Sequence, residues 1–315
     1  MTDPTTHDLI ILGGGAAGLT AAIYATRAGI DALTIEQGAF GGQITTTDEV
    51  DNYPGIEGVS GAELGTKFQD HAENLGAKFA FDAISSISFD EKESRFSLVG
   101  DEGSYQSKTL VYAAGATPRK AGFEGEDLFR GRGVSYCATC DGMFYTGKHV
   151  FIIGGGNSAC EEAVFLSRFA SDVTMIVRKD HLRAMSSGIR QVEQNEKISV
   201  RYLTSITKLE GETLPTSITF RDNVSGEEHV ETFDPGSFGI FVSVGHVPQS
   251  GLVRELVELS PDGSIVTDDS MATKTLGLFC AGDVRTKPLR QVITAAADGA
   301  IAATSAALFL GELVI

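Results

Sequence analysis

A strand, a glycine-rich turn and a helix occur in that order twice along this chain, and this repeat constrains the fold most. The first copy has the apolar run Leu9–Leu12, the turn Gly13–Gly18 and an alanine-rich segment, 16–28, that ends before Gly29. A short apolar run is typical of a strand buried on both faces, and glycine commonly ends a helix. The next apolar run, Ala32–Ile35, completes a βαβ unit. The pattern predicts an α/β fold.

The first glycine turn has the form that binds a dinucleotide. Gly13, Gly15 and Gly18 let the backbone approach a pyrophosphate at the helix N-terminus. Glu36 ends the second strand 23 residues after Gly13, where a carboxylate can bind ribose hydroxyls. A lone glycine motif is weak evidence, but here the strand, the helix and the acid are all in position. We therefore predict a dinucleotide site at the first copy.

The second copy repeats this design with the opposite charge at its tip. Its strands are 149–153 and 172–177, its turn is Gly154–Ala159, and its helix is expected over 158–169. Arg178 stands 24 residues after Gly154, in the position that an acid holds in the first copy. A ribose 2′-phosphate binds well to a cluster of cations, so this tip favours NADP over NAD. A solvated basic turn is the alternative interpretation.

Between the two copies lies Cys137-Ala-Thr-Cys140, followed at once by Asp141. Two thiols at this spacing can close a disulfide and exchange it with other disulfides, and a neighbouring carboxyl can carry the protons. Half of a zinc site is the alternative, but the other cysteines, Cys160 and Cys280, are isolated in apolar segments. A redox-active dithiol beside two dinucleotide sites predicts a flavin disulfide reductase.

The composition narrows the class of protein. A length of 315 residues suggests two domains, and a net charge of −17 disfavours binding to nucleic acids or anionic membranes. The start of the chain lacks a signal-peptide pattern, and no run reaches the roughly 20 uninterrupted apolar residues of a membrane helix. We therefore expect a cytoplasmic protein, in which a purely structural disulfide is disfavoured.

A third signal lies near the end of the chain. The apolar run from Leu278 leads to Gly282-Asp283, and a long alanine-rich helix is expected from about Arg290. Asp283 could bind a ribitol hydroxyl of a flavin cofactor, and the helix N-terminus could stabilise a reduced flavin ring. A strand–loop–helix connection with an acidic cap is the alternative.

Together these segments resemble the low-molecular-weight bacterial thioredoxin reductases, and the resemblance covers essentially the whole chain. The set, in its order and spacing, is more specific than any one motif. Further segments that carry it are Gly41-Gly42-Gln43, Thr45-Thr46-Thr47, Asn52-Tyr53-Pro54-Gly55, Ala113-Ala114-Gly115-Ala116, Gly245-His246-Val247-Pro248, Gly282-Asp283-Val284-Arg285 and Arg290-Gln291-Val292.

The resemblance implies two Rossmann-like nucleotide-binding domains. A discontinuous FAD-binding domain, residues 1–117 and 246–315, would receive an inserted NADPH-binding domain, residues 118–245, that carries the redox-active disulfide. The family forms homodimers with one FAD per chain, and electrons pass from NADPH through FAD and the disulfide to thioredoxin. The inserted domain rotates to present either the nicotinamide or the disulfide to the flavin.

The resemblance also implies the site residues. Cys140 would be the sulfur next to the flavin, Cys137 the sulfur that attacks the partner, and Asp141 the general acid and base. No metal site is predicted. The predicted FAD contacts are Gly13, Gly15, Ala16, Ala17, Gly18, Glu36, Gln37, Gly42, Gln43, Asn52, Ala114, Gly115, Asp283, Arg290, Gln291 and Val292. The predicted NADPH contacts are Gly154, Gly156, Asn157, Ser158, Arg178, Lys179 and Arg183.

Some positions depart from the family pattern. Where the family has His-Arg-Arg, this chain has Val177-Arg178-Lys179. Where the family has two phenylalanines after the thiol pair, this chain has Met143-Phe144. We expect these two side chains and Arg132, which matches a thioredoxin-contacting position, to form a docking site. Two alternatives remain open: a flavoenzyme of the same fold that is fed by ferredoxin or works as a dithiol oxidase, and a non-catalytic FAD redox sensor.

Overall fold

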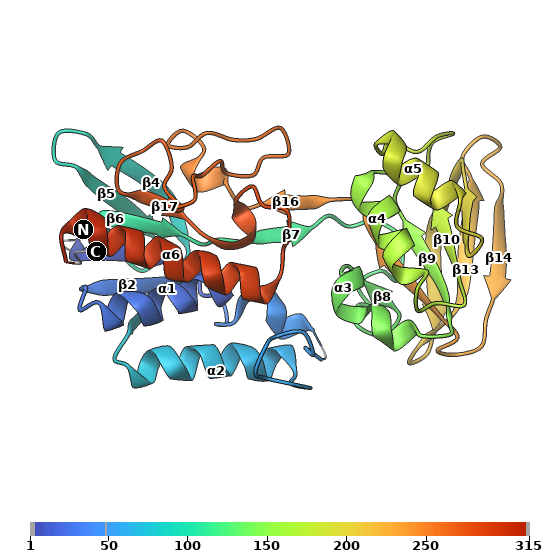
Figure 1. Ribbon diagram of the computed structural model, residues 1–315, viewed down its shortest axis with the longest axis horizontal. Helices are drawn as coiled ribbons and strands as arrows, with labels where there is room; N and C mark the ends of the chain where they lie inside the picture. Colours follow the sequence, from blue (N-terminus) through green and yellow to red (C-terminus); the bar gives the residue numbers. More distant parts are fainter. Residues whose placement is uncertain (1–3, 48, 313–315) are drawn as a thin grey trace. The chain divides into compact units, whose positions relative to one another are not determined.

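The structure is a computed structural model that describes residues 4–47 and 49–312. The chain divides into two compact units (Figure 1). Unit 1 comprises Met1–Thr117 and Val247–Ile315, and unit 2 comprises Pro118–His246. The chain therefore leaves unit 1 once and returns to it, with unit 2 inserted between. These limits lie within one residue of the predicted domain boundaries. At the two crossings the short strands β7 (Ala116–Pro118) and β16 (His246–Pro248) pair with each other.

Unit 1 is built on a seven-stranded sheet. Six strands follow the order β3-β2-β1-β6-β5-β4, and the seventh, β17, also pairs with β6. The pairs among β3, β2, β1, β6 and β17 are parallel, and β5 and β4 extend the sheet in antiparallel pairs. The strands are β1 (Thr5–Leu12), β2 (Ala32–Glu36), β3 (Lys78–Phe81), β4 (Ile84–Asp90), β5 (Arg95–Gly100), β6 (Ser104–Tyr112) and β17 (Leu278–Cys280). The two predicted strands of the first copy are confirmed, and β1 begins four residues earlier than expected.

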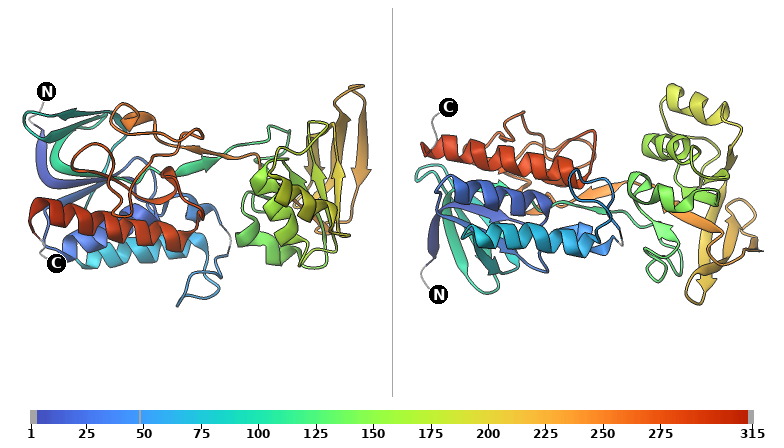
Figure 2. Two further views of the ribbon diagram at one scale, coloured as in Figure 1. Left: turned by 45° about the horizontal axis from the view of Figure 1, so that its top comes forward. Right: turned by 60° about the horizontal axis from the view of Figure 1, so that its bottom comes forward.

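The sheet of unit 1 has a buried layer on each face, as the continuous apolar run of β1 requires. Leu9 and Ile11 pack in the cluster that includes α1 and α6, and Ile10 and Leu12 pack in another cluster with Val253 and other residues. Figure 2 shows α1 and α6 running alongside each other. The helical segments of this unit are α1 (Ala16–Arg27), α2 (Gly61–Asn74), α6 (Val292–Leu310) and the 3-10 turns η1 (Gly42–Thr46), η3 (Gly251–Val253) and η4 (Gly282–Val284).

Helix α6 is long and apolar enough to cross a membrane by its composition alone. It is nevertheless a core helix, because Ala302 and Ala306 are fully buried and Asp298 forms ion pairs within unit 1. Its predicted start near Arg290 is wrong by two residues. Gln291 stands before the helix in extended conformation and forms a capping box with Thr294, and this sets the first helical residue at Val292.

Unit 2 has a five-stranded parallel sheet in the order β11-β10-β9-β15-β8 and a three-stranded antiparallel sheet in the order β12-β13-β14. The expected helix over 158–169 ends three residues early. Ser167 stops it, because its hydroxyl bonds back to the Val164 carbonyl and accepts a hydrogen bond from Asn195. The elements are β8 (Val134–Ser135), α3 (Ala138–Asp141), η2 (Gly142–Tyr145), β9 (His149–Ile153), α4 (Asn157–Leu166), β10 (Asp172–Ile176), α5 (Ser186–Glu193), β11 (Ile198–Arg201), β12 (Thr204–Gly211), β13 (Pro215–Asp222), β14 (Glu228–Thr232) and β15 (Phe238–Val242).

Candidate functional site

The first glycine turn connects β1 to α1 and leaves the helix N-terminus without a side-chain cap. Gly13 has φ 113°, and a Cβ there would overlap the carbonyl of Ala113, the residue that follows β6. A Cβ on Gly18 would overlap the Gly13 carbonyl, so helix and turn are in close contact. Gly15 is the N-cap of α1 and has no side chain to bind the first amides. These amides are therefore available to an anion such as a pyrophosphate.

Glu36 lies beside this turn at the end of β2. Its Oε2 accepts a hydrogen bond from the Gly14 amide at 2.6 Å, and its Oε1 accepts one from the Gly38 amide at 2.9 Å. A carboxylate oxygen can accept more than one hydrogen bond, so both oxygens can still accept ribose hydroxyls. The backbone bonds hold the carboxylate against the glycine turn, which is the geometry that a bound ribose needs.

Asp283 and Arg290 carry buried polar atoms that have no hydrogen-bond partner among the described residues: Asp283 Oδ1 and Arg290 Nε. Burial raises the pKa of Asp283, and Lys287 and Arg290 act in the opposite direction. Buried polar atoms without a partner are rare in proteins and call for an explanation, such as a ligand. Unit 1 thus fits a cofactor with hydroxyl groups at this point.

A buried ion cluster lies close to Asp283 in the chain, and sequence analysis did not predict it. Asp298 of α6 accepts hydrogen bonds from Lys287 at 2.7 Å, from Arg285 at 3.2 Å and from the Gly282 amide at 3.1 Å. The Lys287 side chain is only 3% exposed. The cluster ties η4 and the following loop to α6, and so holds the segment that carries Asp283.

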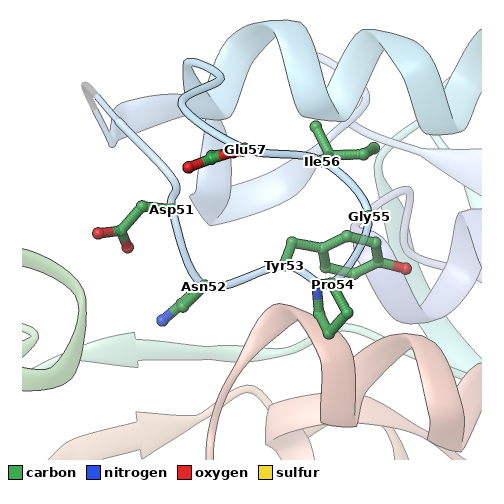
Figure 3. Close-up of a pocket in the computed structure, with 7 residues that line it drawn as sticks. All are labelled: Asp51, Asn52, Tyr53, Pro54, Gly55, Ile56 and Glu57. Atoms are coloured by element: carbon green, nitrogen blue, oxygen red, sulfur yellow. The ribbon is translucent and has the colours of Figure 1, made fainter.

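Two residues that were predicted to contact FAD, Asn52 and Gln291, lie far apart in the sequence but contact each other in unit 1. The Asn52 amide donates to Gln291 Oε1 at 3.1 Å, so the loop after η1 reaches the N-terminus of α6. Asn52 is part of the segment Asp51–Glu57, which lines an open pocket of about 510 Å³ (Figure 3). Gln43 donates to the Ala116 carbonyl. The remaining predicted contacts lie on the same elements: Ala16 and Ala17 in the first turn of α1, Gln37 after β2, Gly42 in η1, Ala114 and Gly115 after β6, and Val292 at the start of α6.

The second glycine turn, in unit 2, repeats the geometry of the first. Gly154 has φ 153°, and a Cβ there would overlap the carbonyl of Ser243, the residue that follows β15. Gly156 is the N-cap of α4 and again offers no side chain, with Asn157 and Ser158 exposed in the first turn. A pyrophosphate can therefore bind here as well.

The cations predicted for the 2′-phosphate lie beside this turn. The Arg183 amide donates to the Gly155 carbonyl at 2.6 Å, and the Met185 amide donates to Asn157 Oδ1 at 2.7 Å. These two bonds fold the loop that follows β10 back onto the turn. The side chains of Arg178, Lys179 and Arg183 are exposed, and none of them forms an ion pair with another described residue.

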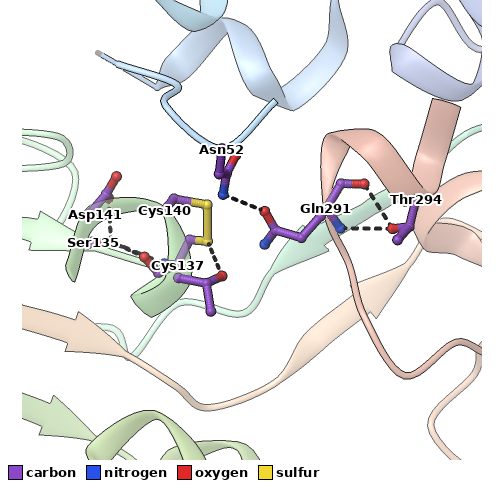
Figure 4. The surroundings of a disulfide bond; sticks show 8 residues. Asn52, Ser135, Cys137, Cys140, Asp141, Gln291 and Thr294 are labelled. Atoms are coloured by element: carbon purple, nitrogen blue, oxygen red, sulfur yellow. Dashed lines mark hydrogen bonds between the residues drawn. A yellow bond between two sulfur atoms is a disulfide. The ribbon is translucent and has the colours of Figure 1, made fainter. Parts of the chain in front are cut away.

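Cys137 and Cys140 form a disulfide at the N-terminus of the short helix α3 (Figure 4). This confirms the pairing. Both cysteines are partly exposed, whereas Cys160 and Cys280 are free and buried. A partly exposed disulfide can be attacked by a thiolate from another molecule, and buried thiols are inert.

Asp141 is linked to this disulfide through Ser135, which sequence analysis missed. Ser135 Oγ donates to Asp141 Oδ2 at 2.6 Å and accepts from the Cys137 amide at 3.1 Å (Figure 4). The available signal was a hydroxyl at the end of a strand, two residues before the first thiol. Tyr136 is held from the other side, because its hydroxyl donates to the buried Glu126 at 2.6 Å. No sequence signal distinguished Glu126 from an exposed turn residue.

Comparisons with known proteins agree with this geometry. A sequence model of the pyridine nucleotide-disulphide oxidoreductase family matches residues 7–299. The chain is 43% identical to a thioredoxin reductase of Peptoclostridium litorale over 310 residues, 98% of each chain. It is 41% identical to a thioredoxin reductase of Bacillus subtilis over 314 residues, 99% of this chain and 98% of the relative. The crystal structure of thioredoxin reductase from Streptococcus pyogenes matches with a TM-score of 0.91 at 35% identity, over 99% of this chain and 100% of the other.

Proposed function

The chain belongs to the pyridine nucleotide-disulphide oxidoreductase family, and on that premise we propose that it is an NADPH-dependent thioredoxin reductase. The observation that carries the proposal is the Cys137–Cys140 disulfide, with Asp141 next to it, in a unit that has its own dinucleotide turn. A unit with both features can bind the nucleotide that supplies electrons and hold the disulfide that these electrons reduce to a dithiol.

Unit 1 is the proposed FAD site. Glu36 would bind the adenosine ribose, the amides before α1 would bind the pyrophosphate, and Asp283 would bind the ribitol chain. The unpaired buried atoms of Asp283 and Arg290 support this assignment, because bound cofactor hydroxyls and phosphates would pair with them. FAD, when bound, supplies a two-electron relay between a nicotinamide and a disulfide.

Unit 2 is the proposed NADPH site. Arg178, Lys179 and Arg183 would bind the 2′-phosphate, and the exposure of all three leaves them accessible to a nucleotide that enters and leaves. Two of them are arginines, which bind phosphate in bidentate geometry, and Lys179 adds a point charge. The proposal therefore includes a preference for NADPH over NADH.

The two cysteines have separate proposed roles. Cys140 is the sulfur that exchanges electrons with the flavin, and Cys137 is the sulfur that attacks thioredoxin. In the attack Cys137 loses its proton to Asp141, its electron pair forms a mixed disulfide, and the partner's leaving sulfur takes up a proton. The Cys140 sulfur then attacks Cys137 and closes the Cys137–Cys140 bond again; the mixed disulfide breaks, and the departing thioredoxin sulfur takes up the proton that Cys140 loses.

Thioredoxin and a second copy of the chain are the proposed partners, in the cytoplasm. Met143 and Phe144 are 55% and 44% exposed directly after the thiol turn, and Arg132 is exposed before it. Such an apolar pair suits a transient docking surface. On α6, Ile293 and Ile301 are also exposed, which supports a homodimer through unit 1.

Anaerobic titration of the purified holoprotein with NADPH, and separately with NADH, tests the proposal, with thioredoxin turnover as the companion assay. We expect NADPH to bleach the flavin at much lower concentration than NADH, and thioredoxin to be reduced catalytically. Reduction by neither nucleotide would favour a ferredoxin-fed enzyme. Flavin reduction without turnover of any disulfide would favour a redox sensor.

A further inference from the structure

Ser135 ends β8, two residues before Cys137, and joins the Asp141 carboxyl to the backbone of the thiol turn. The serine is 4% exposed. Its Oγ donates to Asp141 Oδ2 at 2.6 Å, accepts from the Cys137 amide at 3.1 Å and lies 3.4 Å from the Cys137 carbonyl oxygen. Pairing of β8 with β15, Ser135 opposite Phe241, fixes the position of the serine in the sheet.

The serine hydroxyl has one hydrogen and two acceptors within reach, Asp141 and the Cys137 carbonyl. A distance of 2.6 Å is typical of a hydroxyl that donates to an ionised carboxylate, so the hydrogen points to Asp141 while that group is charged. After Asp141 takes up a proton, its oxygens accept more weakly, and the hydrogen can turn to the Cys137 carbonyl. Ser135 therefore favours the ionised carboxylate and still has an acceptor after protonation.

We propose that Ser135 is a positioning residue that sets the pH range in which Asp141 exchanges protons with the thiol pair. This inference rests on the proposed function, in which Asp141 is the acid and base. The Cys137 S–H bond breaks and its proton moves to the Asp141 carboxylate. The sulfur electron pair forms the mixed disulfide, the partner's S–S bond breaks, and the leaving thiolate takes the proton. Ser135 forms and breaks no covalent bond, and it acts through Asp141.

Other titratable groups lie on the elements packed against α3. They are Cys160, Glu161 and Glu162 of α4, Tyr145 of η2, and Cys137 and Cys140 themselves when reduced. Burial raises the pKa of Glu162 to about 7, and a hydrogen bond with Ser243 opposes the rise. Because Glu162 titrates within the working pH range, the test must separate it from Asp141, and Glu162→Gln does so.

The test is the pH profile of thioredoxin-driven reoxidation of the pre-reduced holoenzyme, a step that needs no nicotinamide. In Ser135→Ala the acidic limb should move up by about 1 pH unit, because a donor to the carboxylate is lost. Ser135→Thr keeps the hydroxyl and should leave the limb near the wild-type position. Glu162→Gln should leave it unmoved. Ser107→Ala, which removes a buried hydroxyl without a partner among the described residues, is the matched control.

The inference is overturned if the acidic limb of the pH profile stays at the wild-type pH in a folded Ser135→Ala variant. It is also overturned if the limb of Ser135→Thr moves as far as the limb of Ser135→Ala. If Ser135→Ala does not fold, Ser135→Gly removes the same hydroxyl. Asp141→Asn separates the acid–base role of Asp141 from the positioning role of Ser135. A limb that survives Asp141→Asn contradicts the acid–base role in the proposed function. A limb that Asp141→Asn abolishes but Ser135→Ala leaves in place contradicts only the role of Ser135.

Discussion

The two glycine turns share a backbone and differ in their surroundings. In each turn the first glycine, Gly13 or Gly154, has a positive φ and packs against a carbonyl that follows a neighbouring strand. In each turn a glycine N-cap leaves helix amides available. Beyond the turns the units differ: unit 1 pairs its turn with Glu36 and with buried polar atoms, and unit 2 pairs its turn with exposed cations.

The charge of the chain follows the same division. Unit 1 has 25 acidic and 11 basic residues, and unit 2 has 17 acidic and 14 basic residues, so their formal net charges are −14 and −3. An anionic nucleotide that must bind and leave repeatedly meets less repulsion at unit 2. Under the proposed function, the turn geometry would select a pyrophosphate, and the groups around each turn would decide whether the nucleotide stays bound or exchanges.

The largest expected effect separates the two sulfurs of unit 2. Cys137→Ser and Cys140→Ser should each lower thioredoxin turnover more than about 1,000-fold, as loss of a nucleophile does. Cys137→Ser leaves the Cys140 thiolate, which should give a long-wavelength charge-transfer band with oxidised flavin in the absorption spectrum. Cys140→Ser should lack the band. A band in Cys140→Ser alone would reverse the two roles.

Matched glycine substitutions come next. Gly13→Ala and Gly154→Ala each add a Cβ against a carbonyl at positive φ, at a cost of about 2–3 kcal/mol. Gly13→Ala should lower the FAD content of the purified protein, measured by absorbance. Gly154→Ala should keep its FAD but lose reduction by NADPH. Gly251→Ala, at an open position, should change neither. Loss of FAD in both variants would contradict the assignment of the Gly13 turn to FAD and of the Gly154 turn to NADPH.

Neutralising the basic tip of unit 2 should change nucleotide choice. With Arg178, Lys179 and Arg183 replaced by glutamine, the KM for NADPH should rise. Each lost phosphate contact should weaken NADPH binding by about 1.5–3 kcal/mol, and by less where water replaces the contact. The KM for NADH should change little, and Arg190→Gln, at an exposed residue of α5, is the single-charge control. Equal use of NADPH and NADH by the wild type would contradict the phosphate-binding role.

Glu162 of α4 should make the stability of unit 2 depend on pH. Its folded pKa of about 7 lies above the unfolded value of 4.5, so the native state holds the proton between these values. The free energy of unfolding should therefore fall as pH rises from 4.5 to 7, by up to about 3 kcal/mol. Denaturant titrations should show Glu162→Gln losing this dependence. Glu161→Gln, exposed on the same helix, should keep most of it, because burial raises the pKa of Glu162 more than the Glu161 charge does. A Glu162→Gln variant with the wild-type pH dependence would contradict the assignment.

The docking surface should give the smallest effect. Arg132→Ala and Phe144→Ala should each raise the KM for thioredoxin. The apparent free energy of thioredoxin binding should weaken by about 1–2 kcal/mol in each variant. Reduction of a small disulfide with NADPH should stay nearly intact in steady-state assays. Leu128→Ala, exposed in the loop before the thiols, serves as a control for lost apolar surface. Equal loss of both activities would mean that these residues support the active site instead.

The sequence predicted what local patterns determine and missed what tertiary contacts determine. Both strand–turn–helix copies and the Cys137–Cys140 pair were predictable, because each lies in one short segment. The ends of α4 and α6 were not, because Ser167 and Gln291 act through hydrogen bonds that no periodicity shows. The Ser135–Asp141 bond depends on the turn of α3, and the Lys287–Asp298 pair depends on the packing of α6.

In the proposed function, electrons from NADPH reach the Cys137–Cys140 disulfide of unit 2. Differential alkylation read by mass spectrometry tests it most directly on the anaerobic holoenzyme after one equivalent of NADPH. We expect label on Cys137 and Cys140, and none on Cys160 and Cys280, which are buried. A protein whose flavin is reduced while Cys137 and Cys140 stay unlabelled would contradict this electron path.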